Sequence, residues 1–123
     1  MKIKVTREDI DDIMIAALEG GITYWCCKAE AVGSNLGAYA SQQIGRGGAL
    51  RLYDNDGSNS YFLNTNRLLD GIKKYVEAGN KPHGILCQAS DNAGCRRIDS
   101  AQVDATVADM IVQYAVLGEI VYG

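Results

Sequence analysis

Three stretches of the chain carry apolar residues at the three- and four-residue spacing of an amphipathic helix, and capping residues bound each stretch. A helix with such a stripe buries one face against another element, so this pattern constrains the fold strongly. We predict three long helices, and a shorter one around residues 36–44. The long stripes begin near Thr6, at Asn64 or Thr65, and at Asp99, and they stop at Gly20, Gly79 and Gly118.

The residues at the ends of the stripes indicate why the helices start and stop. Thr6 followed by Asp9 resembles a capping box with Asp in place of Glu, and Asp99 followed by Gln102 forms another. The glycine pair at 20–21 is expected to supply the left-handed backbone conformation that ends many helices. We therefore expect helix boundaries at these residues.

The segments between the stripes favour strands. Residues 2–5 alternate polar and apolar side chains, and residues 22–32 are rich in β-branched and aromatic residues. Two short alternating segments, 50–53 and 61–63, flank residues 54–59, which are dense in turn formers. This arrangement predicts a β-hairpin.

The predicted fold class is α+β: a small antiparallel β-sheet packed against about three α-helices in a single domain, residues 1–123. The chain has 123 residues, 47% of them hydrophobic and 22% charged, which is the length of one domain and an ordinary globular composition. A disordered chain is excluded on this composition. Residues 81–98 show no clear periodicity, and we predict that they are irregular.

The charge balance bears on the class of partner. Fifteen acidic and twelve basic residues give a net charge of −3, which disfavours nucleic-acid polymers because binding to them depends on neutralising phosphates. No apolar run approaches the roughly 18 residues that span a bilayer, and the first residues lack the apolar segment of a signal peptide. We therefore expect a soluble, cytoplasmic protein with no membrane partner. Because a domain of this size has little interior for an enclosed cleft, we also expect a homo-oligomer with binding sites between subunits.

Patterns typical of catalysis or metal binding are weak. The cysteines form no Cys-x-x-Cys pair, and the single histidine, His83, stands in a segment that favours a loop. Asp104 and Asp109 are five residues apart, about 140° around a helix, and do not form a close carboxylate pair. A small nucleotide hydrolase would have to use Asp104, Asp109 and His83. We predict reduced thiols, no metal, no cofactor and no enzyme activity. The cysteines are Cys26, Cys27, Cys87 and Cys95.

The first candidate ligand site is the sequence Gly-Arg-Gly-Gly at residues 45–48. Consecutive glycines such as Gly47 and Gly48 let backbone N–H groups turn toward one anion, and Arg46 adds a planar fork that grips phosphate. The alternative interpretation is a helix C-terminal cap that runs into a turn before the next strand.

A second candidate lies at residues 90–97, where the acidic chain is locally basic. Asn92 suits ribose hydroxyls or the edge of a base, and the adjacent guanidinium groups of Arg96 and Arg97 suit phosphates. The alternative is an ordinary solvated loop.

A third candidate is the aromatic pair Tyr24 and Trp25. In a strand over residues 22–32, alternation sends the two rings to opposite faces of the sheet. We expect Trp25 to pack in the core, which leaves Tyr24 to stack on a base or to pack against another subunit.

Three blocks of the sequence resemble a family of small proteins encoded by phages and prophages of Gram-positive bacteria. The first, residues 17–26, contains the motif Ala-Leu-Glu-Gly-Gly-x-x-Tyr-Trp. The second is Ala-Ser-x-Gln-Ile-x-Arg-Gly-Gly at residues 40–48, and the third covers residues 108–123. In size and pattern the chain is similar to the first family of Thoeris anti-defence proteins.

The resemblance implies a sponge: a phage protein that sequesters, without cleaving, cyclic ADP-ribose isomers made by bacterial TIR-domain immune enzymes. In some members it also implies sequestration of the cyclic oligonucleotides of the CBASS system. It further implies dimer-based homo-oligomers, up to hexamers, in the infected bacterial host cell, with the ligand between protomers. A diphosphate flanked by riboses and a purine would be held by guanidinium, amide, carboxylate and aromatic groups.

At residue level, Asn92 and Asp109 match the binding residues of that family best. Met110 stands where the resemblance places an arginine. We therefore expect other arginines of this chain to contact the phosphates. The candidates are Arg46, Arg51, Arg96 and Arg97.

The alternative function is a phage protein–protein interaction or inhibitor protein, comparable to an anti-CRISPR protein, with no nucleotide ligand. The net charge of −3 is compatible with this alternative, although it is too weak for DNA mimicry.

Overall fold

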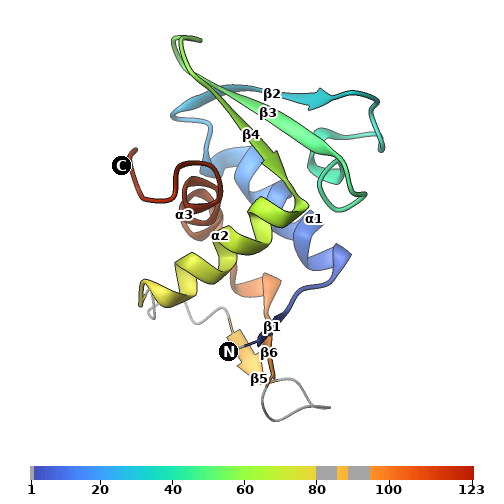
Figure 1. Ribbon diagram of the computed structural model, residues 1–123, viewed down its shortest axis with the longest axis vertical. Helices are drawn as coiled ribbons and strands as arrows, with labels where there is room; N and C mark the ends of the chain where they lie inside the picture. The colour runs from blue at the N-terminus through green and yellow to red at the C-terminus, as the bar shows by residue number, and fades with distance from the viewer. Residues whose placement is uncertain (1, 80–85, 89–94) are drawn as a thin grey trace.

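A computed structural model describes residues 2–79, 86–88 and 95–123 of the chain. The helices are α1 (Arg7–Ala16), α2 (Thr65–Glu77) and α3 (Ala105–Leu117), and the strands are β1 (Lys2–Lys4), β2 (Cys26–Val32), β3 (Ala49–Asp54), β4 (Ser60–Asn64), β5 (Leu86–Gln88) and β6 (Cys95–Ile98). The helices lie between an antiparallel sheet in the order β2-β3-β4 and a smaller sheet in the order β1-β6-β5 (Figure 1). The predicted α+β class, with a small antiparallel sheet and three α-helices in one domain, is confirmed.

The predicted hairpin is formed by β3 and β4, in which Leu52 lies opposite Tyr61. Side chains of β3 alternate cleanly, because Leu50 and Leu52 are buried against the helices while Arg51 and Tyr53 lie on the other face. β2 pairs antiparallel with the other edge of β3. The sheet therefore has an inner face on the core and an outer face toward solvent.

The smaller sheet overturns the prediction that residues 81–98 are irregular, because β5 and β6 fall within them. β6 runs parallel to β1, with Ile3 beside Arg96, and antiparallel to β5. A strand of four residues shows little periodicity, and its partner β1 lies near the start of the chain. This pairing is a tertiary interaction that local sequence pattern does not indicate.

Helix starts follow the capping residues. The box at the start of α1 is confirmed: the Thr6 N–H donates to Asp9 Oδ2 (2.9 Å), and the Asp9 N–H donates to Thr6 Oγ1 (3.1 Å). Asn64 caps α2, since its Oδ1 accepts the Arg67 N–H at 2.9 Å.

The glycines after α1 act differently from our expectation. The chain continues into one π-helical turn, Ala17–Gly21, and neither glycine has a positive φ. The predicted left-handed stop is therefore wrong. Gly21 is needed for packing, because a Cβ at this position would lie 2.6 Å from the carbonyl oxygen of Ala105 in α3.

The third helix begins later than predicted. Asp104 is its N-cap, and Asp104 Oδ1 accepts the Val107 N–H at 2.9 Å. Asp99 instead caps a single 3₁₀ turn, Ser100–Gln102. The stop is confirmed, since Gly118 has a φ of 78°.

Two other predicted elements are shorter in the structure. Of the predicted helix at 36–44, only the 3₁₀ turn Ala40–Gln42 forms, and the predicted strand 22–32 begins at Cys26. Gly79, with a φ of 77°, lies just past α2 as expected.

The core lies where α2 and α3 pack closely together beneath the inner face of the sheet. A Cβ at Gly71 of α2 would lie 2.6 Å from the carbonyl oxygen of Ile111 in α3, so glycine permits this close approach. Each fully buried Leu or Ile contributes about 1.5–3 kcal/mol. The fully buried aliphatic residues include Ile13, Ile22, Ile44, Leu50, Leu52, Leu63, Leu68, Ile72, Ile98 and Ile111. Within the described part of the chain, no helix has the length and apolar character needed to cross a membrane.

Candidate functional site

Tyr24 and Trp25 both contact the carboxylate of Asp109, and the sequence analysis singled out all three residues. Asp109, in the first half of α3, is 8% exposed. Its Oδ2 accepts a hydrogen bond from the Tyr24 hydroxyl (2.6 Å), and its Oδ1 accepts one from the indole Nε1 of Trp25 (2.8 Å). Asp109 is thus a buried centre of hydrogen bonding.

A turn before β2 explains how both aromatic side chains reach α3. The backbone N–H groups of Trp25 and Cys26 both donate to the carbonyl oxygen of Ile22, at 3.0 and 2.8 Å. Tyr24 and Trp25 therefore lie in a turn and not in a strand, so the prediction that they point to opposite sheet faces is wrong. The predicted core position of Trp25 is confirmed, since its exposed fraction is 3%.

Gln113, one helical turn after Asp109, ties the C-terminal segment to this cluster. Its Nε2 donates to Asp109 Oδ1 (2.9 Å) and to the carbonyl oxygen of Tyr122 (3.0 Å). Its Oε1 accepts the N–H groups of Val121 (2.8 Å) and Tyr122 (2.9 Å). Sequence reasoning gave Gln113 no role, although a single amide within an apolar helix is a signal that such a network exists.

The tethered segment places Tyr122 on the indole of Trp25. The two rings are parallel within 2°, with centroids 4.7 Å apart. Tyr61 approaches Trp25 edge-on at 6.1 Å, and the hydroxyls of Tyr61 and Tyr122 are 2.9 Å apart. Aromatic pairs of this kind contribute about 0.5–1.5 kcal/mol each beyond their buried area.

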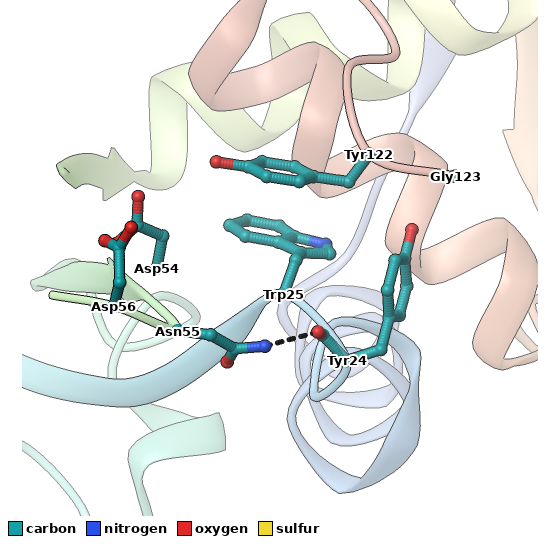
Figure 2. A pocket seen from close by; sticks show the side chains of 7 residues that line it. All are labelled: Tyr24, Trp25, Asp54, Asn55, Asp56, Tyr122 and Gly123. Carbon is teal, nitrogen blue, oxygen red and sulfur yellow. Dashed lines mark hydrogen bonds between the residues drawn. The ribbon is translucent and has the colours of Figure 1, made fainter. Parts of the chain in front are cut away.

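A cavity of about 380 Å³ opens beside these rings. Figure 2 shows Tyr122 over Trp25, with Asp54 and Asp56 together on one side and Asn55 near the backbone of Tyr24. The wall is therefore aromatic on one side and acidic on the other. Its lining residues are Tyr24, Trp25, Asp54, Asn55, Asp56, Tyr122 and Gly123.

The acidic side of the cavity is held in place by the β3–β4 turn. Asp54 Oδ2 accepts from the side-chain amide of Asn59 at 2.8 Å, and Asp56 Oδ1 accepts the Ser58 N–H at 2.8 Å. Both carboxylates are bound to uncharged donors, so their negative charges remain uncompensated by these contacts. Phosphate groups are repelled from this wall.

Two tyrosines of the cluster, Tyr24 and Tyr122, have raised pKa values. Partial burial, and then the hydrogen bond and charge of Asp109, raise the pKa of Tyr24 to about 12. The hydrogen bond to Tyr61 is the largest cause that raises the pKa of Tyr122 to about 12, with Asp54 and Asp56 contributing. Both hydroxyls therefore keep their protons near neutral pH.

The hydrogen bonds of Asp109 define what it does. A carboxylate offers about four lone-pair sites, and Tyr24, Trp25 and Gln113 occupy three of them. Asp109 therefore positions the aromatic side chains, and its contribution to a ligand site runs through Tyr24 and Trp25.

The Gly-Arg-Gly-Gly turn, a predicted phosphate site, uses its glycine N–H groups within the turn. The Gly47 N–H donates to the carbonyl oxygen of Ile44 (3.0 Å), and the Gly48 N–H donates to that of Gln43 (2.9 Å). With a φ of 88° at Gly47, this is the geometry of a helix C-terminal cap. This geometry favours the cap interpretation, and the guanidinium of Arg46 stays available to an anion.

The remaining predicted residues lie elsewhere. Arg96 and Arg97 are exposed on β6, at the end of the molecule opposite the β2-β3-β4 sheet (Figure 1). Arg97 lines a second cavity, of about 270 Å³, together with Asp9, Asp12 and Asp99. Arg51 lies on the outer face of the β2-β3-β4 sheet. Asn92 and His83 fall outside the described residues.

Of the cysteines, Cys26 is buried and Cys27 is exposed, and both are free thiols. Cys26 Sγ donates to the carbonyl oxygen of Lys28 (3.3 Å), and Cys27 Sγ donates to that of Asp54 (3.1 Å). Burial raises the pKa of Cys26, so its thiol is a weak nucleophile. Over residues 2–79, 86–88 and 95–123, no three His, Cys, Asp or Glu side chains are grouped to hold a metal ion.

The chain matches no protein-family model, no curated protein and no solved structure. The functional interpretation therefore depends on the geometry of the aromatic cluster and on the sequence blocks that contribute to it.

Proposed function

We propose that the chain is a phage anti-defence sponge, which binds and sequesters cyclic ADP-ribose isomers, and also cyclic di- and trinucleotides, without cleaving them. It acts in the cytoplasm of the infected bacterial host, as a dimer-based homo-oligomer of up to six subunits. Its ligands are the nucleotide signals produced by bacterial immune enzymes.

One observation carries the proposal. Tyr24 and Trp25 belong to the first of the sequence blocks that resemble phage proteins, and Asp109 belongs to the third. These residues converge beside a single cavity of about 380 Å³. The first and third blocks thus contribute to the same site, although they lie far apart in the sequence.

The chemistry of the cavity supports binding of a nucleoside. Tyr24 is 48% exposed, and its ring can stack on a base, while the Asn55 amide suits a ribose hydroxyl or a base edge. Asp54 and Asp56 repel phosphates, so the diphosphate of the ligand lies outside the cavity. A ligand in this orientation meets cationic side chains on another surface or on another copy of the chain.

Sequestration sets the affinity that the protein has to reach. A sponge works only if it lowers the free signal below the threshold of its effector, which corresponds to nanomolar binding, about 12 kcal/mol. Tight, reversible capture requires neither a nucleophile nor a general base.

Calorimetric titration with cyclic ADP-ribose isomers and with a cyclic trinucleotide tests the proposal. The protein is expected to bind one of these ligands tightly and to release it unchanged, as judged by chromatography, after heat denaturation. Asn55→Trp, which fills the cavity from an exposed turn, is expected to weaken binding at least tenfold. Asn35→Trp, also at an exposed position, is the matched control. Cleaved ligand would make the protein an enzyme, and no binding of any cyclic nucleotide would favour the interaction-protein alternative.

A further inference from the structure

The outer face of the β2-β3-β4 sheet carries a patch formed by Arg51, Phe62 and Arg67, here named the arginine–phenylalanine patch. Arg51 of β3 lies opposite Phe62 of β4, and Arg67 lies in the first turn of α2, just after β4. The Cζ atoms of Arg51 and Arg67 are 5.8 and 5.6 Å from the centre of the Phe62 ring. Both guanidinium groups thus make cation–π contacts with one ring.

The positive charges of the patch are not neutralised by the protein. In the described part of the chain, neither Arg51 nor Arg67 forms an ion pair with a carboxylate. Two like charges near one ring repel each other, and an anion bound at the patch reduces this cost.

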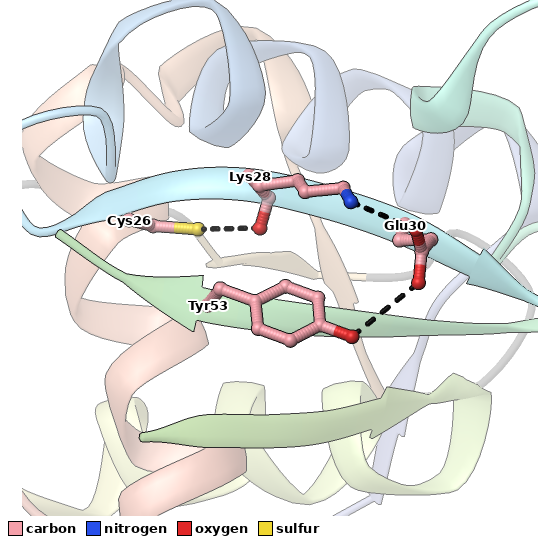
Figure 3. A network of polar contacts seen from close by, with 4 residues as sticks. All are labelled: Cys26, Lys28, Glu30 and Tyr53. Atoms are coloured by element: carbon pink, nitrogen blue, oxygen red, sulfur yellow. Dashed lines mark hydrogen bonds and ion pairs between the residues drawn. The ribbon is translucent and has the colours of Figure 1, made fainter. Parts of the chain in front are cut away.

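The sheet register places one carboxylate beside the patch, and that carboxylate is engaged elsewhere. Glu30 of β2 lies opposite Arg51, but its Oε2 pairs with Lys28 Nζ at 2.9 Å. Its Oε1 accepts the hydroxyl of Tyr53 at 3.3 Å, as Figure 3 shows. The pairing with Lys28 also holds the pKa of Glu30 below its ordinary value. Glu30 and Lys28 therefore neutralise each other, and the positive charges of Arg51 and Arg67 are not balanced by Glu30.

Each arginine is oriented by one hydrogen bond. Arg51 Nη1 donates to Ser60 Oγ (3.3 Å), and Arg67 Nη1 donates to the carbonyl oxygen of Phe62 (3.1 Å). A guanidinium has five N–H donors in a planar fork, so most of them remain for a ligand. Both forks are partly pre-organised on the same ring.

The position of Arg67 is a second, independent indication of an anion. In the first turn of a helix the backbone dipole disfavours a cation and favours an anion. Arg67 occupies this turn in α2, a helix of 13 residues. An anion bound at the patch would interact favourably with Arg67 and with the positive end of the helix together.

We propose that the arginine–phenylalanine patch binds the phosphate groups of a phosphorylated ligand, with the guanidinium forks of Arg51 and Arg67 on the phosphate oxygens. The identity of the ligand rests on the function proposed above: if that function holds, the patch takes the diphosphate that Asp54 and Asp56 keep out of the aromatic cavity.

Titration with inorganic pyrophosphate and, separately, with a cyclic ADP-ribose isomer tests the proposal. The proteins compared are the wild type, Arg51→Gln/Arg67→Gln, and Arg7→Gln/Lys73→Gln, which removes the same charge from exposed positions of α1 and α2. Pyrophosphate is expected to bind the wild type and the control variant equally. Its affinity is expected to fall roughly tenfold for each arginine removed from the patch, because hydrogen bonds to charged groups are lost. Arg51→Lys/Arg67→Lys keeps the charge, loses the fork, and is expected to show an intermediate affinity.

The use of two ligands distinguishes a failure of the patch proposal from a failure of the proposed sponge function. If pyrophosphate does not bind, or binds all variants with equal affinity, the proposal that the patch binds phosphate groups is wrong. A cyclic ADP-ribose isomer that binds all variants equally supports the sponge and overturns the patch as its diphosphate site. Patch-dependent pyrophosphate binding with no affinity for any cyclic nucleotide supports the phosphate site and overturns the sponge.

Discussion

The indole Nε1 of Trp25 donates a 2.8 Å hydrogen bond to Oδ1 of Asp109, 84 positions further along the chain. This bond connects the turn before β2 to α3. The Tyr24 hydroxyl and the Gln113 amide donate hydrogen bonds to the same carboxylate. Three side-chain donors of the protein therefore hydrogen-bond the buried carboxylate of Asp109. The network is a structural unit that sets the positions of the aromatic rings around the cavity.

Replacement of Asp109 tests the stability of that network. Asp109→Ala leaves the indole N–H of Trp25 buried without its acceptor, so we expect a loss of about 3 kcal/mol or more in the free energy of unfolding. Urea unfolding monitored by circular dichroism measures it. Asp70→Ala, which breaks only an exposed ion pair with Lys74, is the control and is expected to cost about 1 kcal/mol or less. Equal losses in both variants would contradict the network.

The neighbouring glycines after α1 offer a matched pair of substitutions. Gly21→Ala drives a Cβ to 2.6 Å from the carbonyl oxygen of Ala105, and we expect it to destabilise the protein by about 1–3 kcal/mol. At Gly20 the nearest atom to a Cβ is 3.9 Å away, so Gly20→Ala is expected to stay within about 0.5 kcal/mol of the wild type. Thermal unfolding of the two variants compares them. The reverse order of stability would show that Gly20 and not Gly21 is the constrained position.

High pH is expected to weaken the fold through Tyr24 and Tyr122. Their pKa values are raised to about 12 in the folded protein, from the ordinary tyrosine value of 10.0. The folded state therefore keeps protons that the unfolded state loses, and the stabilisation is complete below pH 10 and lost as the pH rises toward 12. Urea unfolding across this range measures the loss.

Removal of the two hydroxyls supplies the control for that pH dependence. Tyr24→Phe/Tyr122→Phe keeps both rings and is expected to flatten the alkaline loss of stability. A variant that loses stability with pH as steeply as the wild type would assign the effect to other groups.

Release of the C-terminal segment is expected to expose the indole. Gln113→Ala removes the acceptor of the Val121 and Tyr122 N–H groups and the donor to the Tyr122 carbonyl. Because Trp25 is the single tryptophan, its fluorescence reports the loss of the stacked Tyr122 ring as increased quenching by acrylamide. Thr106→Ala, at an exposed position of the same helix, is expected to leave quenching unchanged. Quenching of Gln113→Ala at the wild-type level would mean that the segment is held by the ring contacts alone.

Local sequence patterns were sufficient for the parts of the fold that local interactions build. The Thr6–Asp9 box, the β3–β4 hairpin and the stop at Gly118 depend on residues a few positions apart, and all are confirmed. The parallel pairing of β6 with β1 depends on contacts between distant segments. The alternation at residues 2–5 predicts a strand there, but it does not indicate which strand pairs with it.

In the candidate site, too, local sequence pattern indicated single residues but not the contacts between distant segments. The sequence pointed to Tyr24, Trp25 and Asp109 one by one, but only the fold shows that they share hydrogen bonds. The role of a glycine is also hard to predict, because Gly21 serves close packing while Gly47 supplies a positive φ, and the two roles look alike in sequence. The arginine–phenylalanine patch likewise depends on strand register, which places Arg51 beside Phe62.

Native mass spectrometry of the protein mixed with an equimolar cyclic ADP-ribose isomer tests the sponge most directly. The account predicts an oligomer whose mass equals that of its subunits plus intact ligand, and dissociation in the gas phase that returns the ligand at its original mass. Subunits without ligand, or ligand recovered with one added water, would contradict it.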